Sequence, residues 1–172
     1  MIMIKTIFIF VVGFLSVFQG YAQTDSLNKR PPFELKLFVD DSKSFSLPVG
    51  ETKYISNDTI LNIFPGEKLF LEATITNNRV TNFRVVNEIK DASKTLTIDF
   101  QQKAKGKVHQ FMTLTVTNPF DKKLHYKAMM NLLRNNKWVN TNVYPVLPNI
   151  KGIEMWTDPI AILALGSFEL ND

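Results

Sequence analysis

The chain has 172 residues, of which 45% are hydrophobic, and it carries 20 basic and 16 acidic side chains for a formal net charge of +4. It contains no cysteine, which excludes disulfides, thiolate metal sites and cysteine nucleophiles. The positive excess is small and scattered along the chain, so nothing in it favours nucleic acid as a partner.

Residues 1–22 have the three parts of a secretory signal peptide. Lys5 supplies a positive start, residues 7–18 form an apolar run, and Gly20 and Ala22 are the small residues of a cleavage site. The run is shorter than the about 20 apolar residues that a membrane-spanning helix needs. We therefore expect export to the periplasm or the extracellular space, with cleavage after Ala22. A signal that is retained as an anchor is the alternative, and only then would the protein associate with a membrane.

The exported chain is expected to begin with a flexible leader, residues 23–32, which is polar and ends in two prolines. From residue 33 onward, apolar side chains recur at every second position, which is the period of a half-buried strand. Turn-forming residues separate these runs at short intervals. The alternating apolar residues that we expect to face a core are Phe33, Leu35, Leu37 and Val39, then Leu69, Leu71, Ala73 and Ile75, then Leu96, Ile98 and Phe100, and then Met112, Leu114 and Val116.

Residues 113–130 predict a hairpin of two paired strands around a turn at Asn118 and Pro119. The segment 126–133 contains residues that favour helix, but it continues the alternation, so we interpret it as strand. The side chains that this second strand should direct to the core are Leu124, Tyr126, Ala128 and Met130, which leaves His125 facing solvent.

Many short strands with turns at this spacing predict an all-β fold, an antiparallel two-sheet sandwich of about eight or nine strands. The strand pattern is typical of immunoglobulin-like or fibronectin-type-III-like sandwiches. The Cys–Trp–Cys pattern of immunoglobulin domains is absent, so the description concerns architecture and identifies no family. No repeat or long linker interrupts residues 33–172, which we expect to form a single domain.

The last predicted strand, residues 159–170, begins with a nearly continuous apolar run in which the alternation fails. A strand that is apolar on both faces lies in the centre of a sheet with both faces covered, or it presents one face to a partner. The central position is the interpretation that we favour, and the interface remains the alternative.

The sequence contains no recognisable catalytic or cofactor motif, so we expect no enzyme activity and no cofactor. The two histidines, His109 and His125, are both expected on outer faces and too far apart in the predicted hairpin to share a metal ion. The turns at residues 40–42 and 57–59 offer oxygen donors for calcium but lack the glycine-centred loop of an EF-hand, so we interpret them as simple turns.

The C-terminal third contains three aromatic residues beside amide side chains. Trp138, Tyr144 and Trp156 are flanked by Asn140, Asn142 and Asn149, and exposed aromatics with such neighbours can form a platform for a sugar ring or a peptide. Core anchoring of both tryptophans is the alternative. These three residues are our candidate surface for a ligand or partner.

We therefore expect an exported, non-catalytic β-sandwich that serves as a binding or assembly module of the bacterial cell envelope, with a protein or glycan partner. Two alternatives stay open: a small secreted hydrolase whose carboxylates are brought together by the fold, and an envelope protein held by its uncleaved signal. The sequence leaves the oligomeric state undetermined.

Overall fold

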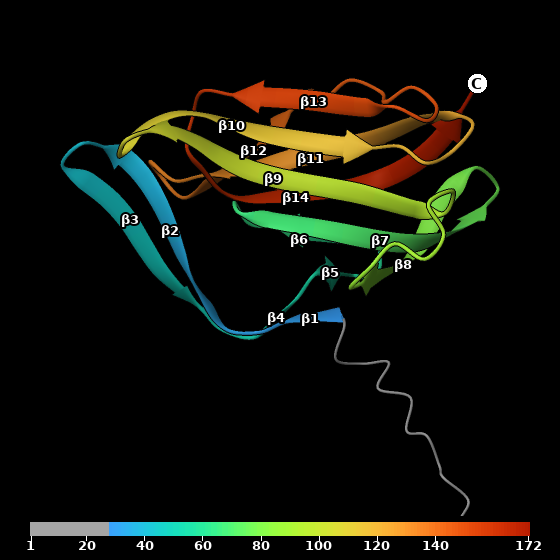
Figure 1. The fold of residues 1–172 in the computed structure, drawn as a ribbon, viewed down its shortest axis with the longest axis horizontal. Helices are drawn as coiled ribbons and strands as arrows, with labels where there is room; N and C mark the ends of the chain where they lie inside the picture. The colour runs from blue at the N-terminus through green and yellow to red at the C-terminus, as the bar shows by residue number, and fades with distance from the viewer. Residues whose placement is uncertain (1–27) are drawn as a thin grey trace, which may run out of the picture.

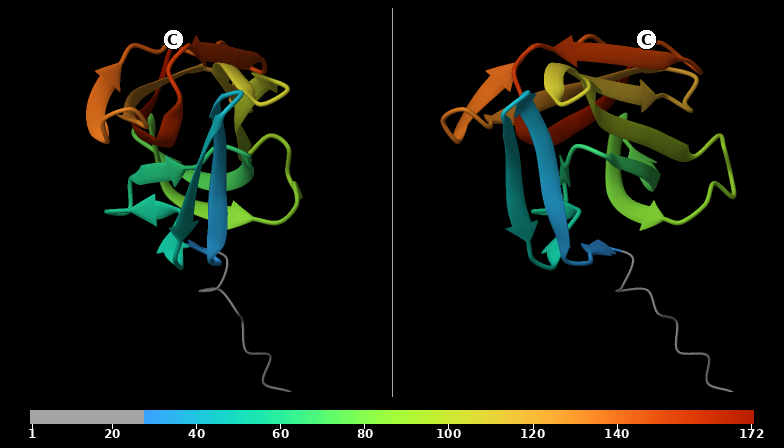
Figure 2. Two further views of the ribbon diagram at one scale, coloured as in Figure 1. Left: turned by 90° about the vertical axis from the view of Figure 1, so that its left-hand side faces the viewer. Right: turned by 60° about the vertical axis from the view of Figure 1, so that its left-hand side comes forward.

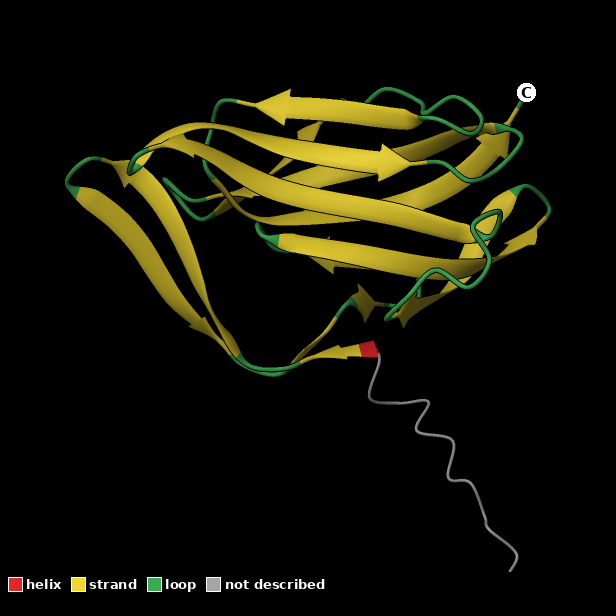
Figure 3. Ribbon diagram, in the orientation of Figure 1, coloured by secondary structure: helices red, strands yellow, loops and turns green. Residues whose placement is uncertain are grey.

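The computed structural model describes residues 28–172, and in this part of the chain the regular structure consists of fourteen β-strands without an α-helix; the short red piece before the first strand in Figure 3 is a 3₁₀ turn at Asn28. The predicted signal peptide, residues 1–22, and residues 23–27 of the predicted leader lie outside the described residues. The predicted all-β, antiparallel character is confirmed. The expected count of eight or nine strands is not confirmed. The structure has fourteen strands, although three of these have only two residues each.

Ten strands form one large antiparallel sheet. In chain order they are β5 (Ile55–Ser56), β6 (Ile60–Ile63), β7 (Glu67–Thr76), β8 (Arg79–Val86), β9 (Thr95–Lys105), β10 (Val108–Thr117), β11 (Lys123–Leu132), β12 (Lys137–Thr141), β13 (Lys151–Trp156) and β14 (Ile160–Asn171). Their spatial order is β12-β11-β14-β8-β7-β9-β10-β13, with β6 also paired to β14 and β5 paired to β6. The end strands β12 and β13 are not paired with each other, so the sheet does not close.

The large sheet folds back on itself at β14 and β8, which are joined through a single residue pair, Glu169 and Arg79. The β9 half comprises β7, β8, β9, β10 and β13, and the β11 half comprises β5, β6, β11, β12 and β14. In Figure 1, β9, β10 and β13 lie in front of β11, β12 and β14. The main core fills the space between the halves, and its fully buried residues come from both, for example Phe100 from β9 and Leu124 from β11. The arrangement is sandwich-like.

The period-two pattern identified most of the inward side chains correctly. All three predicted inward residues of β9 and all three of β10 are fully buried, because alternate strand residues point to the same face. Val39 and Ile75, each near the end of its strand, are exceptions: they are 36% and 47% exposed. The segment 126–133 is confirmed as strand for the most part, since β11 ends at Leu132.

The predicted hairpin at residues 113–130 is wrong. β10 pairs with β9 and β13, whereas β11 pairs with β12 and β14, so the two strands belong to opposite halves. Asn118 makes the crossing between the halves. It is fully buried, its Nδ2 donates to the carbonyl oxygens of Lys122, Val146 and Leu147 at 2.8–3.1 Å, and its Oδ1 accepts from Phe120 N. An Asn-Pro pair indicates a change of direction, but not which half of the sheet the next strand joins.

β14 is a central strand, as the favoured interpretation expected. It lies between β11 on one side and β6 and β8 on the other. The outer face at its start is covered by another part of the same chain, because Ala161 and Ile162 pack in a second apolar cluster with Leu35 and Leu37. No partner protein is therefore needed to cover this apolar run.

That cover is a separate hairpin, β2 (Phe33–Asp40) and β3 (Lys43–Val49), which stands across one end of the sandwich (Figure 2). A series of side-chain hydrogen bonds holds the turn end of this hairpin in place. The side-chain amide of Gln102 accepts from Phe38 N at 2.9 Å and donates to Phe38 O at 2.8 Å, and Gln102 Nε2 lies 2.9 Å from His109 Nδ1. The Nε2 atom of His109 lies 3.0 Å from the carbonyl oxygen of Thr157. Both nitrogens of His109 are therefore engaged, and Gln102, which bonds to both His109 and Phe38, fixes the hairpin to the β9 half.

The end of the expected flexible leader is ordered and carries a buried cation. Lys29 and Arg30 form β1 (Lys29–Arg30), which pairs with β4 (Thr52–Lys53). The Arg30 guanidinium is bidentate to the Glu67 carboxylate at 2.5 and 2.8 Å, and lies 4.2 Å from the ring centre of Tyr54. The flexible leader expected for residues 23–32 therefore does not extend to Arg30, because burial, pairing and stacking fix this residue.

Tyr126 makes the stability of the core sensitive to alkaline pH. Burial, with a smaller contribution from the charge of Glu154, raises the pKa of the Tyr126 hydroxyl above its ordinary value of about 10. The folded state therefore retains a proton that the unfolded chain releases, so the stabilisation is present below about pH 10 and is lost as the pH rises above it.

We expect Tyr126→Phe to keep more of its stability than the parent protein above about pH 10, while the two behave alike near neutrality. The ring, which stacks on Phe168 with centroids 5.8 Å apart, is retained in the variant. Urea unfolding midpoints measured across this range check the result. Burial and the charge of Glu67 also raise the pKa of Tyr54, but that residue is present in both proteins, so the difference reports Tyr126. An equal alkaline loss in both proteins would contradict the assignment.

Candidate binding surface

A row of exposed side chains follows β12 and the segment after it. Between residues 138 and 144 exposed and partly buried residues alternate, so that every second side chain lies on the outer side. Trp138 is 45% exposed and Tyr144 is 81% exposed, and the six residue steps between them span up to about 20 Å. The aromatic row, as we name it, consists of Trp138, Asn140, Asn142 and Tyr144.

β11 continues this face toward the middle of the half. Asn131 lies directly opposite Trp138, and Met129 lies directly opposite Asn140 in the antiparallel register. Directly opposed residues project from the same face and touch. The aromatic row itself contains no charged side chain, and its two amides each provide donors and an acceptor. Such a surface suits an uncharged ligand with many hydroxyl or amide groups.

Trp156 does not belong to the aromatic row. It lies on β13, in the other half, and is partly buried against the main core. Its indole Nε1 donates to Thr141 Oγ1 on β12 at 2.9 Å. Trp156 thus joins the two end strands across the open side of the sandwich. Of the three residues predicted as a surface, the structure brings Trp138 and Tyr144 into one row and gives Trp156 this different position.

Two further contacts hold the same open side together. Glu154 on β13 accepts a hydrogen bond from Tyr144 N at 2.7 Å, and Gly152 packs directly on the Val146 side chain. Val146 also pairs with Leu124, so the segment after β12 continues along the edge of β11. The backbone that carries the aromatic row is therefore fixed by both halves.

An apolar groove of about 270 Å³ lies at the Trp138 end of the row, between the β2–β3 hairpin and the β11 half. Asn131 connects the two features, because it lines the groove and faces Trp138. It is buried, and its Nδ2 donates to Asn136 Oδ1 at 3.1 Å. No pattern in the sequence predicts this groove, since its walls are distant in the chain. It is lined by Leu35, Phe45, Leu47, Asn131, Leu133, Asn136, Ala161 and Ile162.

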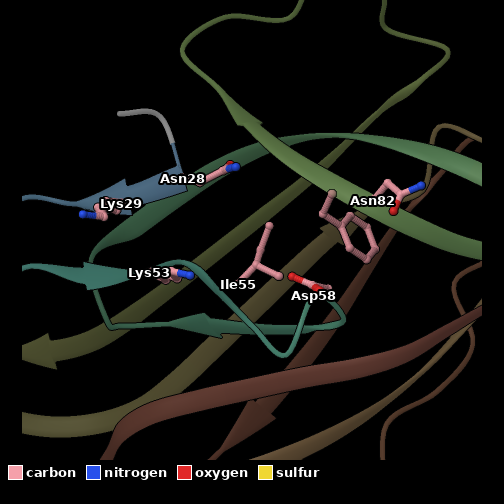
Figure 4. Close-up of a pocket in the computed structure, with 7 residues that line it drawn as sticks. Asn28, Lys29, Lys53, Ile55, Asp58 and Asn82 are labelled. Carbon is pink, nitrogen blue, oxygen red and sulfur yellow. The ribbon is translucent and has the colours of Figure 1, made fainter. Parts of the chain in front are cut away.

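A larger and more polar cleft of about 380 Å³ lies near the start of β1 (Figure 4). Lys29 and Lys53 lie on one side of the view, and Asp58 and Asn82 lie on the other. Lys29 also forms an ion pair with Glu51 at 3.0 Å. Charges of both signs line the cleft from separate elements, and they do not converge on a point where a reacting group would be held.

The two histidines lie on opposite halves, His109 on β10 and His125 on β11. The hairpin register that predicted their separation was wrong, and their separation instead follows from the crossing at Asn118. Within residues 28–172 no group of three or more His, Asp or Glu side chains is arranged to hold a metal ion. In one suggested calcium turn, Asp40 Oδ1 accepts from the hydroxyl and the N–H of Ser42, and these bonds lower the pKa of Asp40.

Comparison with known proteins gives no relative from which a function could be inferred: no family model, curated protein or solved structure matches the chain significantly. Among the described residues, no helix has the length and apolar character needed to cross a membrane.

Proposed function

We propose that the protein is an exported, non-catalytic binding module of the bacterial cell envelope, built as an immunoglobulin-like or fibronectin-type-III-like sandwich, and that it binds an uncharged glycan chain along the aromatic row. The signal-peptide pattern of residues 1–22 supports export. The observation that carries the proposed ligand is the alternation of two exposed aromatic rings and two amides along one side of residues 138–144.

The chemistry of the row matches a sugar polymer. A sugar ring has a C–H face that packs on an aromatic ring, and its hydroxyl groups pair with side-chain amides, which donate and accept. Because six residue steps, up to about 20 Å of extended chain, separate Trp138 from Tyr144, only a chain of several sugar units reaches both. Both halves hold the row in place before binding, so little ordering entropy is lost on association.

The test is affinity electrophoresis and calorimetry of the purified exported protein with a panel of soluble neutral and acidic polysaccharides. We expect binding to a neutral polysaccharide, and at least about tenfold weaker binding for Trp138→Ala and for Tyr144→Ala, the loss that corresponds to about 1.4 kcal/mol. Both side chains are exposed, so both variants should fold normally.

The matched control is Ile75→Ala, which removes an exposed apolar side chain from β7, in the other half. It should bind the polysaccharide like the parent protein. Failure of every polysaccharide in the panel to bind, or equal affinity of all three variants, would overturn the proposal. Capture of a protein partner by the row, without any glycan binding, would overturn it as well.

A further inference from the structure

β13 is an end strand of the large sheet with unused main-chain groups along its outer edge. Among the described strands it pairs only with β10. Asn118 N donates to Ile150 O at 3.0 Å, which fixes the phase of the pairing. In an antiparallel pair, alternate residues bond to the neighbouring strand and those between them point away. The N–H and C=O groups of Lys151, Ile153 and Met155 therefore point away from β10, toward the free edge.

The side chains of these residues are also exposed. Ile153 is 64% and Met155 is 58% exposed, on the outer face beside Thr115 and Thr113 of β10. The alternate residues of β13 face inward and contact β12 and the segment after it, across the open side of the sandwich. β13 is thus a fixed strand whose apolar outer side chains and edge hydrogen-bonding groups have no partner within residues 28–172.

The edge has few of the features that keep exposed strands apart. Proteins protect such edges with proline, bulges or charges. β3, the outer strand of the β2–β3 hairpin, contains Pro48. β13 has no proline, and its register with β10 is continuous from Lys151 to Trp156. Its inward carboxylate, Glu154, is occupied by Tyr144 N. The one charge among its outward residues is Lys151, at the start of the strand.

We infer that β13 pairs in antiparallel fashion with β13 of a second copy of this chain, about a twofold axis through Ile153. Main-chain groups along a free edge are complementary to another strand, and charge selects the register. An axis at Lys151 would place two ammonium groups opposite each other, and an axis at Met155 would leave Lys151 unpaired.

An axis at Ile153 places each Lys151 opposite Met155 of the second copy. Three residue pairs then supply about six main-chain hydrogen bonds, and the two Ile153 side chains cover each other. The two β9 halves become one continuous sheet. This inference is independent of glycan binding, which uses the outer face of the β11 half.

The absence of cysteine from the chain allows a direct test with single-cysteine variants. The Cα atoms of a directly opposed, hydrogen-bonded pair are about 5.5 Å apart, within the range that a disulfide spans. Under mild oxidation we expect Ile153→Cys to form a covalent dimer much faster than Ile75→Cys, an exposed control on β7. Equal rates for the two variants would overturn the inference.

Sedimentation velocity gives a second readout that needs no oxidation. The parent protein should show a concentration-dependent dimer, and Ile153→Lys, which places two ammonium groups together on the axis, should weaken dimerisation at least about tenfold, or 1.4 kcal/mol. Circular dichroism checks that the variant is folded. A parent protein that is monomeric at every concentration, or a dimer that Ile153→Lys leaves unchanged, would show that β13 does not pair with a second copy.

Discussion

Replacing Arg30 with alanine is expected to lower the free energy of unfolding by about 3 kcal/mol, the largest effect of any single change discussed for this protein. Arg30 is 2% exposed and is held by charge on one side and aromatic rings on the other. Besides its two bonds to Glu67, its guanidinium donates to Thr52 Oγ1 at 3.0 Å and to Asn62 O at 2.9 Å. Removing it leaves the Glu67 carboxylate and the Asn62 carbonyl oxygen without this donor.

The estimate is at the lower end of the range for broken buried ion pairs because Glu67 is not completely buried. Its side chain is 17% exposed, so water can solvate part of the carboxylate once Arg30 is absent. Glu67 Oε2 also accepts from Phe64 N at 2.8 Å, and this bond remains. Arg30→Lys should recover only part of the loss, because an ammonium group cannot reproduce the bidentate geometry or the planar stacking on Tyr54.

Equilibrium unfolding in urea measures the effect, with Lys53→Ala as the matched control. Lys53 is exposed on the neighbouring strand β4, and its removal also deletes one positive charge. The control should change stability by less than about 0.5 kcal/mol. The double variant Arg30→Met with Glu67→Gln should be more stable than the sum of the single losses predicts, since neither buried partner is then left as an unpaired charge. Equal stability of Arg30→Ala and Lys53→Ala would show that the network contributes nothing.

The sequence predicted the inward side chains well because alternation is local. A residue such as Leu114 is inward whenever its strand has one buried face, whichever strand lies beside it. Strand order is not local in this sense. The error at residues 113–130 arose because an Asn-Pro turn fits both a hairpin and a crossing. Only the burial of Asn118, with its amide bonded to carbonyl groups 28 and 29 residues away, decides between them.

Arg30 could not be predicted from its neighbours. A polar segment that ends in two prolines is typical of a leader. The residues that bury Arg30 come from three later parts of the chain, β4, β6 and the start of β7. The apolar groove has the same origin, because the β2–β3 hairpin and the β11–β12 turn are far apart in sequence. Neither feature has a signature that a short window could contain.

The candidate site was predictable in part. The four aromatic and amide residues of 138–144 could be named from the sequence, and their alternation with other residues shows why all four share one side. The sequence could not show that Trp156, an aromatic in the same third of the chain, uses its indole N–H to join β13 to β12. Aromatic residues serve both cores and surfaces, and only the position of the strand in the sheet separates these roles.

The second large effect is expected at Gly152, where alanine should lower the free energy of unfolding by about 1–3 kcal/mol. A Cβ atom at this position would lie 2.6 Å from Val146 Cγ2, too close for any ordinary contact. Val146 is buried and paired with Leu124, so its backbone cannot move away freely. Reduced entropy of the unfolded chain would favour alanine by about 0.4–1 kcal/mol, which is less than the cost of overpacking.

Gly50→Ala is the matched control, because a Cβ at Gly50 meets no heavy atom within 4 Å, so only the unfolded-state entropy acts and stability should rise by about 0.4–1 kcal/mol. Combining Gly152→Ala with Val146→Ala supplies the decisive comparison in urea unfolding. The new methyl group then occupies space that Val146 Cγ2 has vacated, so the double variant should be more stable than the two single losses predict, by at least about 0.5 kcal/mol. Strict additivity would mean that the contact between the two halves at this point does not determine how closely β13 packs. A favourable coupling would identify Gly152 as the residue that lets β13 lie against the backbone carrying the aromatic row. It would also explain why the inward face of β13 has a glycine among larger residues.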